Sequence, residues 1–167
     1  MEVGVPGNQT NTEQAMKTEA LVLILDRIVE DLLASTHASR TTLRVDVVEH
    51  SFHVNLPAAE ALSAGAKSLK AEGSLDQRAA ETVKWLERER RLLVQNDVYT
   101  DGPSPPQALI DIYGTRAQML GPLFVEGQLG GWISVHQNGS ARDWSDEDTA
   151  ALTHAVNEVH LALYGGG

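Results

Sequence analysis

The chain has 167 residues and a formal net charge of −10, which is enough length for one domain with its own hydrophobic core. An acidic surface argues against binding to nucleic acid or anionic membranes, which require clustered lysine and arginine. No cysteine is present, and this excludes disulfides, thiolate metal sites, cysteine nucleophiles and thioether-linked chromophores.

The ends of the chain differ in composition from its middle. Residues 1–12 are polar and contain proline and glycine, so we predict a disordered tail, and residues 165–167 form a flexible end. Residues 13–164 are predicted to be a single domain. It opens with a helix over residues 13–35, whose apolar stripe comprises Leu21, Ile24, Leu25, Ile28 and Leu32. Further apolar residues widen the stripe, which favours contact with a second subunit; full burial within one monomer is the alternative.

The next segments are predicted from alternation and composition. Residues 41–48 alternate between apolar and polar side chains, which predicts a strand with two chemically different faces. Residues 51–56 are a weaker strand candidate, and the alanine-rich residues 58–70 predict a helix. Ser74 and Gln77 form a capping-box pattern at the start of another helix.

The C-terminal half has clearer signals. A strand at residues 91–98 is followed by a loop with three prolines and by a short helix at residues 107–113. Residues 116–125 and 128–136 flank a short turn and predict an antiparallel hairpin. Ser145 is predicted to cap the last helix, because three acidic residues follow it. This order of elements predicts an α+β domain with helices on both faces of a sheet.

Three segments resemble the GAF domain family. They are Gly121-Pro-Leu-Phe-Val-Glu-Gly-Gln-Leu-Gly-Gly-Trp-Ile-Ser-Val-His136, Arg142-Asp-Trp-Ser-Asp-Glu-Asp148 and Ser39-Arg-Thr-Thr-Leu-Arg-Val-Asp46. They look like the late paired strands, the opening of the last helix and the first strand of that family. Gly130 and Gly131 also indicate a close backbone approach or a bulge.

The resemblance covers roughly residues 15–164. It implies a central antiparallel sheet with the terminal helices on one face, and a pocket under helices and loops on the other. GAF-like domains bind cyclic nucleotides, bilins, haem or small metabolites, and fold alone does not choose among these ligands. The missing cysteines exclude the free methionine sulfoxide reductase chemistry of the family and covalent bilin attachment.

Other chemistries find little support in the sequence. Neither a nucleophile-elbow Gly-x-Ser-x-Gly nor a phosphate-binding Gly-x-x-x-x-Gly-Lys occurs. The histidines have no metal-ligand spacing, and haem ligation by His136 is not expected. The cofactor is therefore left unknown.

The candidate ligand site follows from strand parity. If the apolar strand faces meet the terminal helices, their polar faces coincide, and a buried polar face needs partners that a polar ligand supplies. An arginine there would hold a carboxylate or phosphate. The alternatives are mutual pairing, such as Asp46 with Arg44, or a face open to water. The predicted ligand-binding residues, including those from the loop at residues 96–113, are Arg44, Asn96, Tyr99, Tyr113, Arg116, Gln118, Trp132, Ser134 and His136.

The sequence therefore predicts a non-catalytic small-molecule sensor. Its terminal helices would form a homodimer and act on a separate effector protein. The alternatives are an interaction module with a vestigial pocket and an enzyme that acts on a small acidic metabolite. The longest apolar run, residues 20–25, is too short for a membrane span, and no signal peptide is visible, so we expect a cytoplasmic protein.

Overall fold

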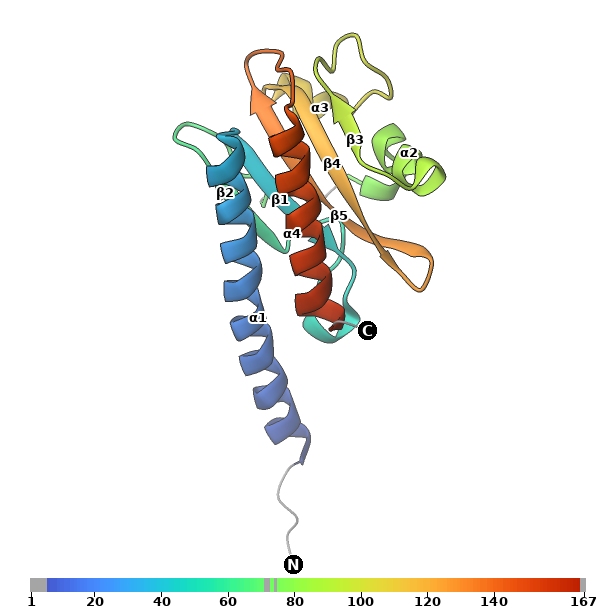
Figure 1. Ribbon diagram of the computed structural model, residues 1–167. Helices are drawn as coiled ribbons and strands as arrows, with labels where there is room; N and C mark the ends of the chain where they lie inside the picture. Colours follow the sequence, from blue (N-terminus) through green and yellow to red (C-terminus); the bar gives the residue numbers. More distant parts are fainter. Residues whose placement is uncertain (1–5, 71–72, 74, 166–167) are drawn as a thin grey trace, which may run out of the picture.

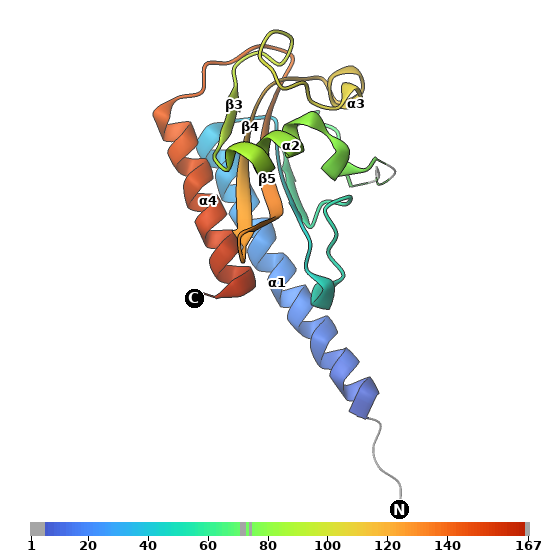
Figure 2. The same cartoon turned by 90° about the vertical axis from the view of Figure 1, so that its right-hand side faces the viewer.

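The fold is a five-stranded antiparallel sheet between two helical layers (Figures 1 and 2). The computed structural model describes residues 6–70, 73 and 75–165. Its strand order is β2-β1-β5-β4-β3, and every neighbouring pair is antiparallel. The α+β prediction is confirmed. The elements are α1 (Pro6–Thr36), β1 (Arg40–Val45), the 3-10 helix η1 (Val48–His50), β2 (Ala59–Leu62), the 3-10 helix η2 (Gln77–Ala79), α2 (Glu81–Glu89), β3 (Leu93–Gln95), α3 (Gln107–Asp111), β4 (Thr115–Val125), β5 (Gln128–Asn138) and α4 (Asp146–Tyr164).

The terminal helices α1 and α4 lie side by side on one face of the sheet (Figure 1). The main core lies between them and the sheet, where Leu25, Val29, Ile133, Val135 and Leu152 are buried. A smaller core around Trp132 and Leu86 lies on the opposite face, beneath α2. No helix in the described part of the chain is long and apolar enough to cross a membrane.

Three predictions about the N-terminal half are wrong. Helix α1 begins at Pro6, so residues 6–12 are helical rather than a disordered tail. Residues 51–56 turn instead of forming a strand, because Ser51 adopts a left-handed conformation and the Val54 amide donates to the Asp46 carboxylate. The alanine-rich residues 58–70 contain β2 rather than a helix.

The reason for the β2 error is packing. Helix propensity is worth only tenths of a kcal/mol per residue, and tertiary contacts override it. Ala59 and Ala61 pair with β1 and are buried against the main core, where small side chains fit. The predicted capping Ser74 lies outside the described residues, and the next helix begins only at Glu81, after Asp76 has capped η2.

The hairpin and the last helix agree with the sequence. Strands β4 and β5 pair along their length, and the Ser145 hydroxyl accepts a hydrogen bond from the Asp148 amide, so Ser145 caps α4. The Asp148 carboxylate in turn accepts from the Ser145 amide, which completes a capping box. At Gly131 β5 passes close to the backbone of β1: a Cβ there would lie 2.3 Å from the Arg44 carbonyl oxygen.

Candidate ligand site

Polar side chains from three strands share the sheet face that lies away from α1 and α4. The register of β1 and β5 places Arg40 opposite His136, Thr42 opposite Ser134, and Arg44 opposite Trp132. On the other side of β5, Gln118 of β4 lies opposite His136. These residues are buried, so the predicted polar face exists and is closed to bulk water.

A cavity of about 60 Å³ lies on this face, and part of its lining comes from α3 and the segments that flank it. These elements lie on the side of the sheet away from α4 (Figure 2). Its polar lining comes from five of the predicted residues together with one that was not predicted, Gln77 of η2. The predicted ones are Arg44, Tyr113, Gln118, Ser134 and His136. Trp132 also lines it, and the remaining lining is apolar, with Leu69, Leu75, Pro106, Ala108, Leu109 and Leu120. Six of the nine predicted site residues therefore meet at one cavity.

Two buried arginines dominate the electrostatics of this face. Arg44 donates from Nη1 to the Val54 carbonyl at 3.0 Å, and Asp46 pairs with Arg78 at 2.6 Å, so the alternative in which Asp46 pairs with Arg44 does not occur. Arg40 donates from Nε to the Lys67 carbonyl at 2.9 Å and from Nη1 to His136 Nδ1 at 2.9 Å. Its Nη2 is buried and has no hydrogen-bond partner among the described residues.

Sequence reasoning missed Arg40. The predicted strand began one residue later, at residue 41, although Arg40 has the same parity as Thr42 and Arg44. A strand started at residue 40 would have placed all three side chains on the polar face. Arg40 is fully buried and lies 5.6 Å from the centre of the Tyr113 ring, behind the cavity wall.

Burial shifts the pKa values of this cluster. Burial lowers the pKa of Arg44 to about 10 and also lowers the pKa of Arg40, although the Glu60 carboxylate opposes both shifts. His136 has its pKa lowered well below the usual value, first by burial and then by the positive charges of Arg40 and Arg44. His136 is therefore neutral at pH 7, and its Nδ1 accepts the hydrogen bond from Arg40.

A pH titration of stability tests the neutral state of His136. Below about pH 6.5 the His136 imidazole binds a proton in the unfolded chain but stays neutral in the folded chain. The free energy of unfolding therefore falls as the pH falls. The loss reaches about 1.4 kcal/mol per pH unit for one such group. We expect urea denaturation between pH 6.5 and 5 to show this slope in the wild type and a smaller slope in His136→Gln. Equal slopes in the two proteins would contradict the assignment.

The other three predicted residues do not reach the cavity. A register shift between Thr115 and Ala117 separates Arg116 from the face of Gln118. Arg116 instead forms two hydrogen bonds with the Asp97 carboxylate, at 3.0 and 2.9 Å, and stacks on the Tyr99 ring at 4.2 Å. Parity counting fails at a bulge, because one extra residue reverses the side-chain direction.

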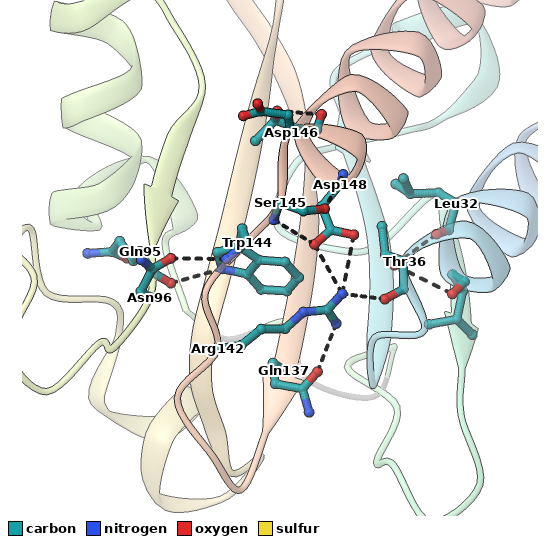
Figure 3. Close-up of polar contacts among 12 residues, drawn as sticks. Leu32, Thr36, Gln95, Asn96, Gln137, Arg142, Trp144, Ser145, Asp146 and Asp148 are labelled. Atoms are coloured by element: carbon teal, nitrogen blue, oxygen red, sulfur yellow. Dashed lines mark hydrogen bonds and ion pairs between the residues drawn. The ribbon is translucent and has the colours of Figure 1, made fainter.

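Asn96, the third of these residues, belongs to a junction around Arg142 and Trp144 (Figure 3). Its carbonyl accepts from the Arg142 amide at 2.9 Å and its side chain accepts from the Trp144 amide at 3.3 Å. The Arg142 guanidinium lies 4.3 Å from the centre of the Trp144 ring, and its Nη1 donates to the Gln137 side chain. The indole Nε1 donates to the Gln95 carbonyl at 3.0 Å.

The same guanidinium joins the two terminal helices. Its Nη2 donates to the Thr36 carbonyl at the end of α1 and to both carboxylate oxygens of Asp148 in the first turn of α4, at 3.2 and 3.1 Å (Figure 3). Arg142 therefore donates to a carbonyl at the C-terminus of α1 and to the capping-box carboxylate, Asp148, of α4.

Gln95 connects this junction to the cavity. Its side-chain oxygen accepts from Gln118 Nε2 at 2.7 Å, and its own Nε2 donates to the carbonyls of Asp101 and Pro103 in the loop before α3. Gln118 lines the cavity, while the Gln95 carbonyl holds Trp144. A continuous chain of contacts thus runs from the cavity wall through β3 to the ends of α1 and α4.

A family model described as GAF domain matches residues 20–163. The match covers most of the chain, from within α1 to within α4. The chain therefore belongs to the GAF domain family, as its C-terminal motifs predicted. A search of curated proteins found no match.

Solved structures share this fold at low sequence identity. GAF3 from Slr1393 of Synechocystis sp. PCC6803, in its photoproduct state, is 21% identical with a TM-score of 0.68, covering 86% of this chain and 93% of that one. The Thermosynechococcus elongatus PixJ GAF domain, in its blue-light-absorbing form, is 18% identical with a TM-score of 0.69, covering 87% and 86%. JSC1_58120g3, in its far-red-absorbing dark state with bound biliverdin IXa, is 14% identical with a TM-score of 0.61, covering 87% of this chain and 96% of that one.

Proposed function

We propose that this chain is a non-catalytic sensory GAF domain whose small-molecule ligand occupies the cavity beside Arg44, Ser134 and His136. The observation that carries the proposal is the buried polar face: Arg44 lines the cavity and donates only one hydrogen bond among the described residues. Buried donors without partners cost free energy, and a polar ligand removes that cost. His136 is held by Arg40 and its pKa is lowered, which makes it a poor general base and supports a binding role.

The size of the cavity bears on the class of ligand. Pockets for drug-sized ligands measure about 300–1,000 Å³, several times the volume of about 60 Å³ found here. Biliverdin, which is bound in one of the structural neighbours, is too large for a cavity of this volume. The absence of cysteine also removes covalent thioether attachment. A small metabolite is therefore the ligand that we propose.

The output of the domain would pass through its terminal helices. The contacts from Gln118 through Gln95 and Trp144 to Arg142 are a physical route by which a change at the cavity reaches both helix ends. We propose that a separate effector protein responds to this change, and that both proteins are cytoplasmic.

A thermal-shift screen of small metabolites tests ligand binding. A ligand present at 100 times its dissociation constant should add about 2.7 kcal/mol to the free energy of unfolding. Ser134→Met should abolish the shift, because Ser134 lines the cavity and a longer side chain fills it. Ser140→Met is the matched control, since Ser140 is exposed, and it should keep the shift. No shift across a broad set of metabolites, or the same shift in both variants, would contradict the proposal.

The proposed homodimer uses the outer surface of α1 and α4. A groove of about 600 Å³ runs between these helices, lined by Leu23, Ile24, Arg27, Ile28, Asp31, Glu158, Leu161 and Ala162. Leu23 is 71% exposed and Leu161 is 58% exposed, an apolar surface beside charges of both signs. The N-terminal half of α1 also extends beyond the body of the domain (Figures 1 and 2). A second copy would cover both features, with acidic and basic groups of one copy facing those of the other.

Light scattering during size-exclusion chromatography tests the dimer. Leu23→Glu places a charge in the groove and should convert a dimer of about twice the chain mass into a monomer, because an unpaired charge in an apolar interface is costly. Val94→Glu introduces the same charge at an exposed position of β3, outside the groove, and should leave the dimer intact. A wild-type monomer at all concentrations would refute the proposed assembly.

A further inference from the structure

The two buried arginines of the cavity face lack the negative charge that they require. Within the described residues neither Arg40 nor Arg44 has a carboxylate within ion-pair distance, although Arg40 is fully buried and Arg44 is 5% exposed. Buried charges are normally paired, because a charged group loses its favourable hydration when it is buried. The positive charge at this site therefore calls for an anion.

The number of charges indicates how much negative charge is missing. Glu60 of β2 lies opposite Thr42 in the register, so it belongs to the same face, and its field acts on both arginines. Its two carboxylate oxygens accept from Ser68 and from the Leu69 amide rather than from an arginine. His136 is neutral because its pKa is lowered, so the two positive charges of Arg40 and Arg44 face the single negative charge of Glu60. One further negative charge balances the site.

Cavity size and lining define the rest of the ligand. One water-sized group occupies roughly 10–15 Å³ on the scale of this cavity, so about 60 Å³ holds about four to six such groups. Besides Arg44, Ser134 and His136, the cavity has an apolar wall, which includes Leu109 of α3 and Leu120, the register partner of Ser134 on β4. A molecule with a charged end and a short hydrocarbon end matches both walls.

We propose that the ligand of this cavity is a small monocarboxylate with two to four carbon atoms. Arg44 binds its carboxylate through the N–H groups that have no protein partner, and Arg40 supplies the second positive charge from behind His136. The planar guanidinium suits a carboxylate, and a single negative charge matches the site better than the nearly two charges of a phosphate. This proposal rests on the proposed function, because it names the ligand class of the same cavity.

Butyrate is the probe, and butyramide is its neutral counterpart of the same shape. With the full chain at constant ionic strength, calorimetry and thermal unfolding should show saturable binding of butyrate and none of butyramide, phosphate or chloride. Arg44→Met should weaken butyrate binding about 30-fold or more, the lower end of the cost of losing a buried charge partner. Arg116→Met should bind like the wild type, because Arg116 lies at Asp97, outside the cavity.

The outcomes separate the ligand class from the sensor function. Equal binding of butyramide, or binding of phosphate or chloride in place of butyrate, would overturn the carboxylate while leaving a ligand site. Butyrate could also fail to bind while another metabolite gives a thermal shift that Ser134→Met abolishes. That result would likewise overturn the monocarboxylate proposal and leave the ligand site. Failure of every compound overturns both proposals. The comparison of butyrate with butyramide uses the wild-type chain, so it stands even if Arg44→Met does not fold.

Discussion

Substituting Arg142 by alanine is expected to lower the free energy of unfolding by about 2–4 kcal/mol. The change leaves the buried Asp148 carboxylate without its cation and the Thr36 carbonyl without its donor, and removing one partner of a buried ion pair is far more costly than removing both. It also removes the stacking of the guanidinium on Trp144. Urea denaturation at pH 7 measures the loss.

Arg116→Ala is the matched control for this substitution. Arg116 also makes two hydrogen bonds to one carboxylate and stacks on an aromatic ring, but its side chain is 31% exposed and that of Asp97 is 23% exposed. Solvent screens such surface pairs, so the control should lose much less stability than Arg142→Ala. If both variants lose the same amount, the joining of α1 to α4 by Arg142 does not stabilise the fold.

Arg142→Ala also addresses signal transfer. If the junction carries a change from the cavity to the helices, a bound ligand should alter amide hydrogen exchange near Thr36 in the wild type but not in the variant. The ligand should still bind, because Arg142 does not line the cavity. The two measurements therefore distinguish a loss of coupling from a loss of binding.

Gly131→Ala is expected to destabilise the domain by about 1–3 kcal/mol, the usual cost of overpacking, or to prevent folding. A Cβ at residue 131 meets the Arg44 carbonyl oxygen at 2.3 Å and the Val45 Cα at 2.8 Å. Both atoms belong to the backbone of the central strand β1, which cannot yield as a side chain does. Since 1 kcal/mol corresponds to about 2–4 °C in a domain of this size, the melting temperature should fall by several degrees.

Gly130→Ala is the neighbouring control. Its Cβ would meet a methyl group of Val125 at 3.0 Å, and a partly exposed side chain can move by a few tenths of an ångström. A smaller loss is therefore expected than at Gly131. Equal losses at the two positions would show that strand flexibility, rather than contact with β1, explains the requirement for glycine.

The sequence alone determined the fold class and most of the polar side chains that line the cavity. Period-two alternation in residues 128–136 places Ser134 and His136 on the face opposite Ile133 and Val135, whatever the sheet packs against. Local capping chemistry likewise determined the start of α4 at Ser145. These features depend on neighbours along the chain, and for that reason they could be read from the residues.

The tertiary structure decided which polar residues meet. Arg40 belongs to the polar cluster at the cavity because it hydrogen-bonds to His136, which is 96 positions away in the sequence. Arg116 points away from that cluster because of a bulge that the local sequence does not predict. The alanines of β2 form a strand because pairing with β1 and burial exceed a helix propensity worth tenths of a kcal/mol. The joining of both helix ends by Arg142 is likewise non-local. Contacts between distant segments depend on register and burial of the whole chain, so only the folded structure shows that Arg44 lines a small cavity and that Arg40 is buried close to it through His136.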